Sequence, residues 1–157
     1  MLTLASHLPE VTFDPGDVVI QEGGEAGGVW VLLSGRLEVR KGDTRVNLIE
    51  RPGAIVGEVS LLLGARHGAT IKALEPTRAR YAADGRAFLL GDTEVPRNIA
   101  VGLAERLNYV TAYLADLKFQ YGDTPGLSMV DTVLTRLAHH QDAPARSGSA
   151  RDPDPDY

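Results

Sequence analysis

The sequence GEVSLLLGARHGAT (residues 57–70) interrupts a series of short, strand-like runs with a segment of helical composition. Residues 57–64 are long enough for one or two helical turns, with Gly57 as an entry and Gly64 as a stop in the left-handed region. The start of such a helix presents unpaired backbone N–H groups. A short helix wedged between strands is unusual, so this segment is the first candidate for a site.

The runs on either side have strand length and are rich in β-branched or aromatic residues. Between them lie turn signals, of which Gly42-Asp43 is the clearest two-residue hairpin because glycine accepts a positive φ. Many short strands at regular spacing predict an antiparallel double-stranded β-helix, a jelly-roll or cupin-like barrel, followed by C-terminal helices. The predicted strands are residues 18–20, 29–33, 37–39, 46–49, 54–56, 69–73 and 78–81.

The chemistry of residues 57–70 favours a nucleotide. A helix N-terminus stabilises a phosphate, a glycine lets the backbone approach it, and a nearby cation adds a charge-assisted hydrogen bond. Glu58 would repel a phosphate, so a sugar hydroxyl is its natural partner.

The segment resembles the phosphate-binding cassette of cyclic nucleotide-binding domains, whose pattern runs Gly-Glu-apolar-small-Leu and, several residues later, Pro-Arg-x-Ala-Thr. Three turns agree with the family: residues 13–17, residues 33–35 and Pro52-Gly53. The resemblance extends over roughly residues 8 to 120. It implies that Glu58 binds the ribose 2′-hydroxyl of cyclic AMP or cyclic GMP and that an arginine binds the cyclic phosphate. No other cofactor and no metal site is expected.

The sequence departs from the family where that arginine belongs. Counted from Gly57, the arginine position falls on His67 and the preceding proline position falls on Arg66. Neighbours in an extended segment face opposite sides, so Arg66 reaches the phosphate only if the loop shifts by one residue. His67 donates most strongly when protonated and lacks the guanidinium fork. The candidate ligand-binding residues are Gly57, Glu58, Val59, Ser60, Arg66, His67, Ala69 and Thr70.

Several of these residues have simpler interpretations. Glu58 is also suited to charge the start of its helix, and Arg66 and His67 to be exposed surface residues. The Thr70 hydroxyl has backbone groups as alternative partners. Trp30 and Tyr81 are expected in the core of the barrel.

The second half of the chain changes to a helical period. Pro96 suits the first turn of a long helix over about residues 94–121. Its apolar residues recur at alternating spacings of three and four, which is a heptad stripe. Such a stripe is suited to pack on the barrel or to pair with a second copy of the helix, and its narrowness favours a symmetric dimer. The Crp/Fnr relatives in the family dimerise through the equivalent helix. The stripe consists of Ala100, Leu103, Leu107, Val110, Leu114, Leu117 and Tyr121.

We therefore expect a cyclic nucleotide-binding-like domain at residues 1–121, a short helical appendage at residues 122–140 and a flexible acidic tail at residues 141–157. A helix-turn-helix domain, which follows in Crp/Fnr regulators, is not expected here. The formal charge of −5 also argues against a surface that binds DNA.

Composition excludes further classes. The absence of cysteine removes disulfides, thiolate zinc sites and a cysteine nucleophile. No apolar run reaches the roughly 18 to 20 residues of a membrane span, and no secretion signal precedes the domain, so we expect a cytoplasmic protein without a membrane partner. No hydrolase, P-loop or kinase motif is present, so no enzyme is expected.

The leading hypothesis is a regulatory sensor that binds cyclic AMP, cyclic GMP or a related nucleotide and signals by conformational change to a partner protein. The alternative is a protein-interaction module that has kept the fold and lost the nucleotide.

Overall fold

The computed structural model describes residues 1–121 and 128–139. It divides into two compact units, Met1–Ile99 and Ala100–Tyr157. Residues 122–127 of the expected appendage and the expected acidic tail at residues 141–157 lie outside the described residues.

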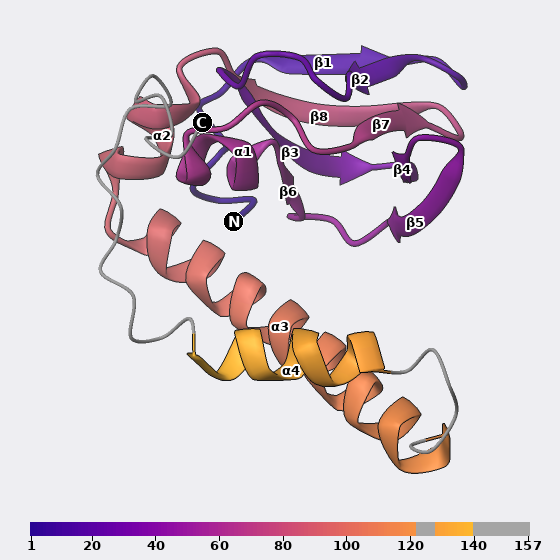
Figure 1. The fold of residues 1–157 in the computed structure, drawn as a ribbon. Helices are drawn as coiled ribbons and strands as arrows, with labels where there is room; N and C mark the ends of the chain where they lie inside the picture. Colours follow the sequence, from indigo (N-terminus) through magenta and orange to yellow (C-terminus); the bar gives the residue numbers. More distant parts are fainter. Residues whose placement is uncertain (122–127, 140–157) are drawn as a thin grey trace, which may run out of the picture. The chain divides into compact units, whose positions relative to one another are not determined.

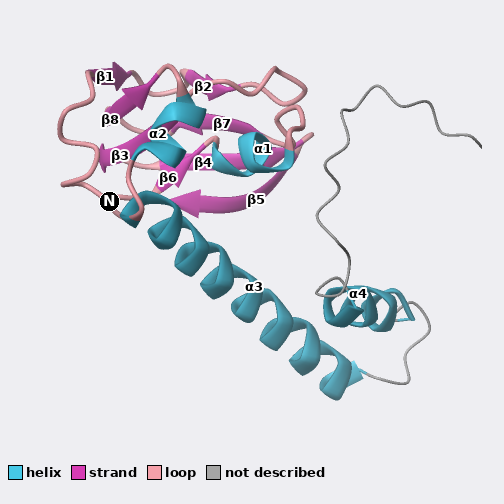
Figure 2. Cartoon of the chain, turned by 90° about the vertical axis from the view of Figure 1, so that its left-hand side faces the viewer, coloured by secondary structure: helices cyan, strands magenta, loops and turns pink. Residues whose placement is uncertain are grey.

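The first unit holds two four-stranded antiparallel sheets (Figures 1 and 2). One sheet has the order β1-β8-β3-β6 and the other β2-β7-β4-β5. Successive strands mostly alternate between the sheets, which is the double-stranded arrangement that the sequence predicts. The strands are β1 (Glu10–Phe13), β2 (Val18–Ile20), β3 (Val29–Ser34), β4 (Leu37–Lys41), β5 (Thr44–Ile49), β6 (Ile55–Val56), β7 (Thr70–Ala73) and β8 (Thr77–Ala82).

The predicted fold class is confirmed, but the sheets do not close into a barrel. Each sheet ends in strands with a single partner, β1 and β6 in one and β2 and β5 in the other. β6 is only two residues long, so it offers little backbone for a further pairing. β1 was missed, because its alternation of polar and apolar side chains lasts for only four residues.

The β4–β5 connection is the two-residue hairpin expected at Gly42-Asp43. Lys41 pairs with Thr44 across the turn, and Gly42 has a φ of 54°. This hairpin is local, so the glycine signal was enough to predict it.

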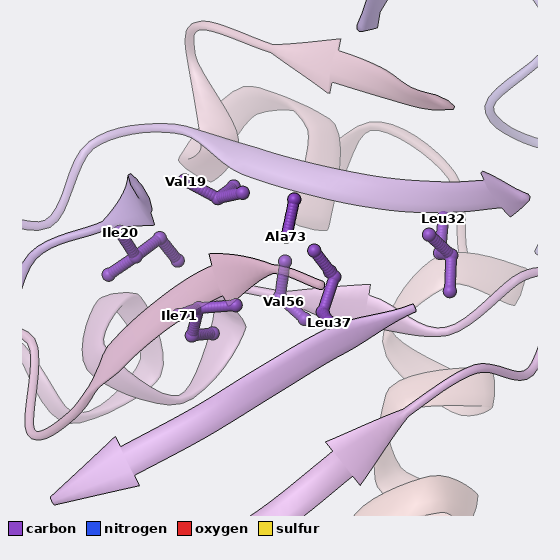
Figure 3. Packing of buried hydrophobic residues seen from close by; sticks show 7 residues of the cluster. All are labelled: Val19, Ile20, Leu32, Leu37, Val56, Ile71 and Ala73. Atoms are coloured by element: carbon purple, nitrogen blue, oxygen red, sulfur yellow. The ribbon is translucent and has the colours of Figure 1, made fainter. Parts of the chain in front are cut away.

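The core lies between the two sheets. Its side chains come from strands of both sheets, and Figure 3 shows them gathered in one cluster. Trp30, Phe13 and Val39 pack against this cluster while remaining partly exposed. The buried cluster consists of Val19, Ile20, Leu32, Leu37, Val56, Ile71 and Ala73.

Four helices complete the described residues: α1 (Glu58–Leu63), α2 (Gly85–Gly91), α3 (Glu94–Tyr121) and α4 (Ser128–His139). The side chain of Asp84 caps α2 by accepting a hydrogen bond from the Ala87 N–H at 2.8 Å. α3 matches the predicted long helix and crosses the boundary between the two units. None of the helices in the described ranges has the length and apolar character of a membrane span.

The β3–β4 turn depends on a glycine for two reasons. Gly35 has a φ of 99°, and a Cβ on it would lie 2.4 Å from Thr77 Oγ1 and 2.8 Å from the carbonyl oxygen of Pro76. The turn therefore touches the start of β8 with no room for a side chain.

We predict that Gly35→Ala lowers the free energy of unfolding by about 3 kcal/mol or more, because backbone strain and a steric clash add. Gly16→Ala is the matched control, since Gly16 has a φ of 94° and open space around it. Strain alone should cost about 1 to 2 kcal/mol there. Urea unfolding measures both variants, and equal losses would show that the contact with β8 contributes nothing.

Candidate functional site

The cassette (residues 57–70) begins at a glycine that no other residue replaces easily. Gly57 follows β6 with a φ of 93°, and a Cβ on it would lie 2.8 Å from the carbonyl oxygen of Gly28. α1 starts at the next residue and ends at Gly64, which has a φ of 62°. Both predicted ends of the short helix are confirmed. The cassette is therefore fixed at its start by contact with the residue before β3.

α1 turns its polar residues inward. Glu58 is 2% exposed and Ser60 is also buried, whereas Val59 is exposed. Glu58 lies in the first helical turn, where a carboxylate is favoured by the helix dipole. A buried acid at this place suits both interpretations of Glu58, as a reader of a ligand hydroxyl and as a helix-start charge.

His67 is buried, so its interpretation as an exposed surface residue is wrong. Its side chain is 8% exposed, and its Nδ1 lies 3.1 Å from Ser60 Oγ. Burial lowers the pKa of His67, and a hydrogen bond to the backbone of Glu25 partly offsets this. The ring is therefore neutral at pH 7. A neutral ring has one donor and one acceptor nitrogen, and a serine hydroxyl takes either role, so the His67 ring and Ser60 form a hydrogen bond in either tautomer.

Arg66 lies on the opposite side of the loop from His67, as expected for neighbours in an extended segment. Its side chain is 67% exposed. Its Nη1 donates to the carbonyl oxygen of Gly23 at 2.9 Å, and its Nη2 lies 3.4 Å from a carboxylate oxygen of Glu25. Arg66 therefore contacts the β2–β3 loop (residues 21–28), and the shift of one residue that would bring it to a phosphate is not seen.

The end of the cassette is hydrogen-bonded to the same β2–β3 loop. Thr70 Oγ1 accepts hydrogen bonds from the Glu22 N–H at 3.0 Å and from Gln21 Nε2 at 3.3 Å. The hydroxyl therefore bonds to the protein itself, which is the simpler of the two interpretations for Thr70. Ala69 is half-buried beside it.

The backbone of the cassette loop (residues 64–69) pairs with the β2–β3 loop. The Gly23 N–H donates to the His67 carbonyl at 2.7 Å, and the His67 N–H donates to the Gly24 carbonyl at 2.9 Å. These two bonds hold His67 with its ring toward α1.

Lys41, at the β4–β5 hairpin, also holds the cassette loop against the β2–β3 loop, and sequence reasoning missed this contact. Lys41 Nζ donates to the Gly68 carbonyl at 2.7 Å and forms an ion pair with Glu22 at 2.7 Å. The hydrogen bonds from Lys41 and from the Gly42 N–H lower the pKa of Glu22. No local pattern reveals this tie, because the partners come from three separate parts of the chain.

Trp30 and Tyr81 are only partly buried, although both were expected in the core. They lie opposite each other on β3 and β8 and stack with ring centroids 4.9 Å apart. A Cβ on Gly28 would lie 2.5 Å from the Tyr81 ring. The stack therefore sets the surface against which Gly28, and through it Gly57, is positioned.

The polar groups of the site satisfy one another. Among the residues that the structure describes, no buried side-chain nitrogen or oxygen lacks a hydrogen-bond partner. The same residues contain no group of histidines and acids arranged to hold a metal ion. Chemically, the site offers a buried acid, a buried hydroxyl and a neutral imidazole.

Several solved structures have a similar fold. The Thermus thermophilus catabolite activator protein is 24% identical with a TM-score of 0.61, over 74% of this chain and 58% of that one. Another similar structure is the second cyclic nucleotide-binding domain of a protein kinase A regulatory subunit, with Sp-2Cl-cAMPS bound. It is 22% identical with a TM-score of 0.54, over 69% of this chain and 75% of that one.

A third similar structure is the regulatory subunit of a cAMP-independent protein kinase A from Trypanosoma brucei. It is 26% identical with a TM-score of 0.52, over 63% of this chain and 37% of that one. This chain thus spans well under two thirds of the length of the Thermus and Trypanosoma proteins. No curated protein sequence matches it significantly.

Residues 10–89 match the cyclic nucleotide-binding domain family, which is just over half of the chain. The match includes β1 to β8, the whole cassette and the start of α2. Together with the two-sheet fold and the short helix between β6 and β7, it shows that this chain belongs to the cyclic nucleotide-binding domain family.

Proposed function

We propose that this chain is a regulatory protein-interaction module that keeps the cyclic nucleotide-binding fold and holds its cassette closed without a nucleotide at neutral pH. One observation carries the proposal: His67, at the family's arginine position, is buried and bonded to Ser60. The role is regulatory and not catalytic.

The chemistry of the cassette supports this choice. A cyclic phosphate is an anion, and its strongest protein partner is the guanidinium group of an arginine, which is charged and donates two parallel hydrogen bonds. The His67 ring is neutral at pH 7, because burial lowers its pKa, and it therefore offers a phosphate no positive charge. To donate to a phosphate, the ring must give up a hydrogen bond that it already makes within the protein, which is worth about 1 kcal/mol net.

Arg66 does not replace the missing guanidinium. Its contacts are the Gly23 carbonyl and the Glu25 carboxylate, both on the β2–β3 loop. The similar trypanosome structure is described as part of a cAMP-independent kinase, which supports the idea that this fold serves regulation without cAMP.

A nucleotide sensor is the second candidate, and the burial of Glu58 favours it. Glu58 is 2% exposed and directly follows Gly57, in the Gly-Glu order of the family pattern, and this supports a role in binding a ligand hydroxyl. In this candidate cAMP, cGMP or a related nucleotide displaces the His67 ring from Ser60 and binds to Gly57, Glu58, Val59, Ser60, Arg66, His67, Ala69 and Thr70. The coupling to a partner would be of the usual size, about 1 to 3 kcal/mol.

A nucleotide titration separates the two candidates. We predict that millimolar cAMP or cGMP leaves the melting temperature of the wild-type chain unchanged at pH 7.4. The double variant Arg66→Pro with His67→Arg restores the family pattern and should gain stability with cAMP. A ligand at 100 times its Kd adds about 2.7 kcal/mol.

The matched control is Arg66→Pro with His67→Gln, which alters the same positions without adding a cation. It should not respond to cAMP. Arg66→Pro removes no hydrogen bond that we observe from the backbone N–H of that residue. A saturable shift of the wild-type chain at pH 7.4 would overturn the interaction module and establish the sensor.

We propose a second copy of this chain as one interaction partner, through the apolar stripe of α3. Leu107 and Val110 are each 46% exposed in the structure, and Leu114 and Leu117 are half-buried. Apolar residues that repeat with heptad spacing bury themselves most readily against a like helix. Since both copies present the same stripe, the pairing is symmetric.

We predict that Leu107→Glu with Leu114→Glu converts a dimer into a monomer, measured by sedimentation velocity. Four carboxylates would be placed along the shared seam. Asn108→Glu with Ala112→Glu adds the same charge on the other side of α3 and should leave the dimer intact. An unchanged mass in the first variant, or a monomeric wild-type chain, would refute the seam.

A further inference from the structure

The outer face of the sheet β2-β7-β4-β5 carries a row of four side chains, one from each strand. The directly opposed pairs in this cross-strand row are Val18 with Lys72, Lys72 with Glu38, and Glu38 with Leu48. Leu37, which precedes Glu38 on β4, belongs to the core between the sheets. Because successive side chains of a strand point to opposite faces, the row faces away from that core.

Glu38 anchors the centre of the row. It is only 6% exposed although it lies on the outer face. Its Oε1 accepts hydrogen bonds from Arg45 Nε at 2.7 Å and from Arg40 Nη1 at 3.2 Å. A buried carboxylate that is bonded to an arginine orients the guanidinium group. The bond from Arg45 uses Nε, so both terminal nitrogens of this half-exposed side chain are left for a second anion.

Lys72 brings a further cation to the same place. It lies on β7 directly opposite Glu38. Among residues 1–121 and 128–139, its side chain has no hydrogen-bond or ion-pair partner. Three cations, Arg40, Arg45 and Lys72, thus surround one acid in a chain whose formal charge is −5. The centre of this face is therefore suited to a negatively charged group.

Apolar side chains form both ends of the row. Val18 is 45% exposed and Leu48 is 38% exposed. The order of the strands separates them by three strand spacings, about 14 Å at about 4.8 Å each. In an extended polypeptide, side chains four residues apart lie on the same face and are separated by about the same 14 Å. The side chain midway between them would lie over the cations.

We propose that this face is a docking surface for an extended segment of a partner protein in which an acidic side chain lies between two apolar ones. The acid binds the terminal nitrogens of Arg45 and the ammonium group of Lys72, and the apolar side chains pack on Val18 and Leu48. The inference rests on the proposed function for its biological purpose, since it gives the interaction module a partner of defined chemistry. The surface itself does not include the cassette.

A polypeptide fits this face better than a nucleic acid does. A phosphate backbone offers anions and no aliphatic side chains, so it would leave Val18 and Leu48 in water. Binding to nucleic acid also depends on many cations that neutralise successive phosphates, whereas this chain is acidic as a whole. A segment that is both acidic and apolar matches the cations and the two exposed aliphatic side chains together.

An NMR titration of the full chain tests the proposal with a synthetic probe, the peptide Leu-Ser-Glu-Ser-Leu with blocked ends. We predict that millimolar peptide shifts the amide signals of Lys72 and Leu48 saturably and leaves those of Gly57 and Ser60 in the cassette unchanged. With glutamine in place of the glutamate, the peptide should bind about five- to tenfold more weakly, as expected when two exposed ion pairs are lost. With serine in place of both leucines, it should also bind more weakly, because the apolar contacts are gone.

Matched variants of the chain locate the site. Arg45→Gln with Lys72→Gln should weaken binding of the original peptide by the same five- to tenfold. Arg86→Gln with Arg97→Gln removes an equal charge from α2 and α3 and should leave the affinity unchanged. If the first double variant fails to fold, Lys72→Gln alone replaces it, since that side chain has no partner to lose among the described residues. It should still weaken binding about two- to threefold.

Four results would overturn the docking surface. They are the absence of shifts at Lys72 and Leu48, equal binding of the glutamine peptide, larger shifts of the same signals with a short DNA duplex, and shifts that depend on the concentration of the chain alone. The third result would assign the face to nucleic acid and the fourth to a second copy. None of them affects the proposed function, which the nucleotide titration tests at the cassette. Conversely, a wild-type chain that responds to cAMP and also binds the peptide would refute that function and keep this surface.

Discussion

The cassette loop is held against the β2–β3 loop by two backbone hydrogen bonds at His67, and the positions of the other groups in the site follow from that pairing. It directs the His67 ring towards Ser60 and leaves Arg66 on the outer side. Lys41 and Thr70 then extend the same contact along the loop. The side chains of the cassette are therefore arranged by a backbone pairing that needs no ligand.

The start of the cassette is fixed by a different constraint, the close approach of Gly57 to the Gly28 carbonyl. Gly28 is itself packed under Tyr81, whose ring stacks on Trp30. This chain of contacts positions the start of α1, where Glu58 is buried. The two ends of the cassette are thus supported separately, and Glu58 is buried although position 67 holds a histidine.

The sequence predicted those features that depend only on residues close to one another in the chain. The ends of α1 are set by two glycines with positive φ, and the β4–β5 turn by Gly42-Asp43, so neighbouring residues sufficed. The burial of His67 was predicted wrongly, because it results from bonds to residues about 40 positions earlier in the chain. Glu22 and Lys41 were missed for the same reason. A short loop that is rich in glycine reveals neither its partner nor which of its side chains turn inward.

The exchange of arginine for histidine changes what a ligand can accomplish at this site. A ligand shifts a conformational equilibrium only by the difference between its affinities for the two states. Where an arginine has no partner until a phosphate binds, the ligand supplies contacts that the free chain lacks, and the difference between its affinities for the two states is large. Here Ser60, Glu25, Gly23 and Gly24 already supply those contacts to His67, so an anion entering at neutral pH has little to add and must first break them. A signal that acts on this cassette therefore has to weaken the internal bonds.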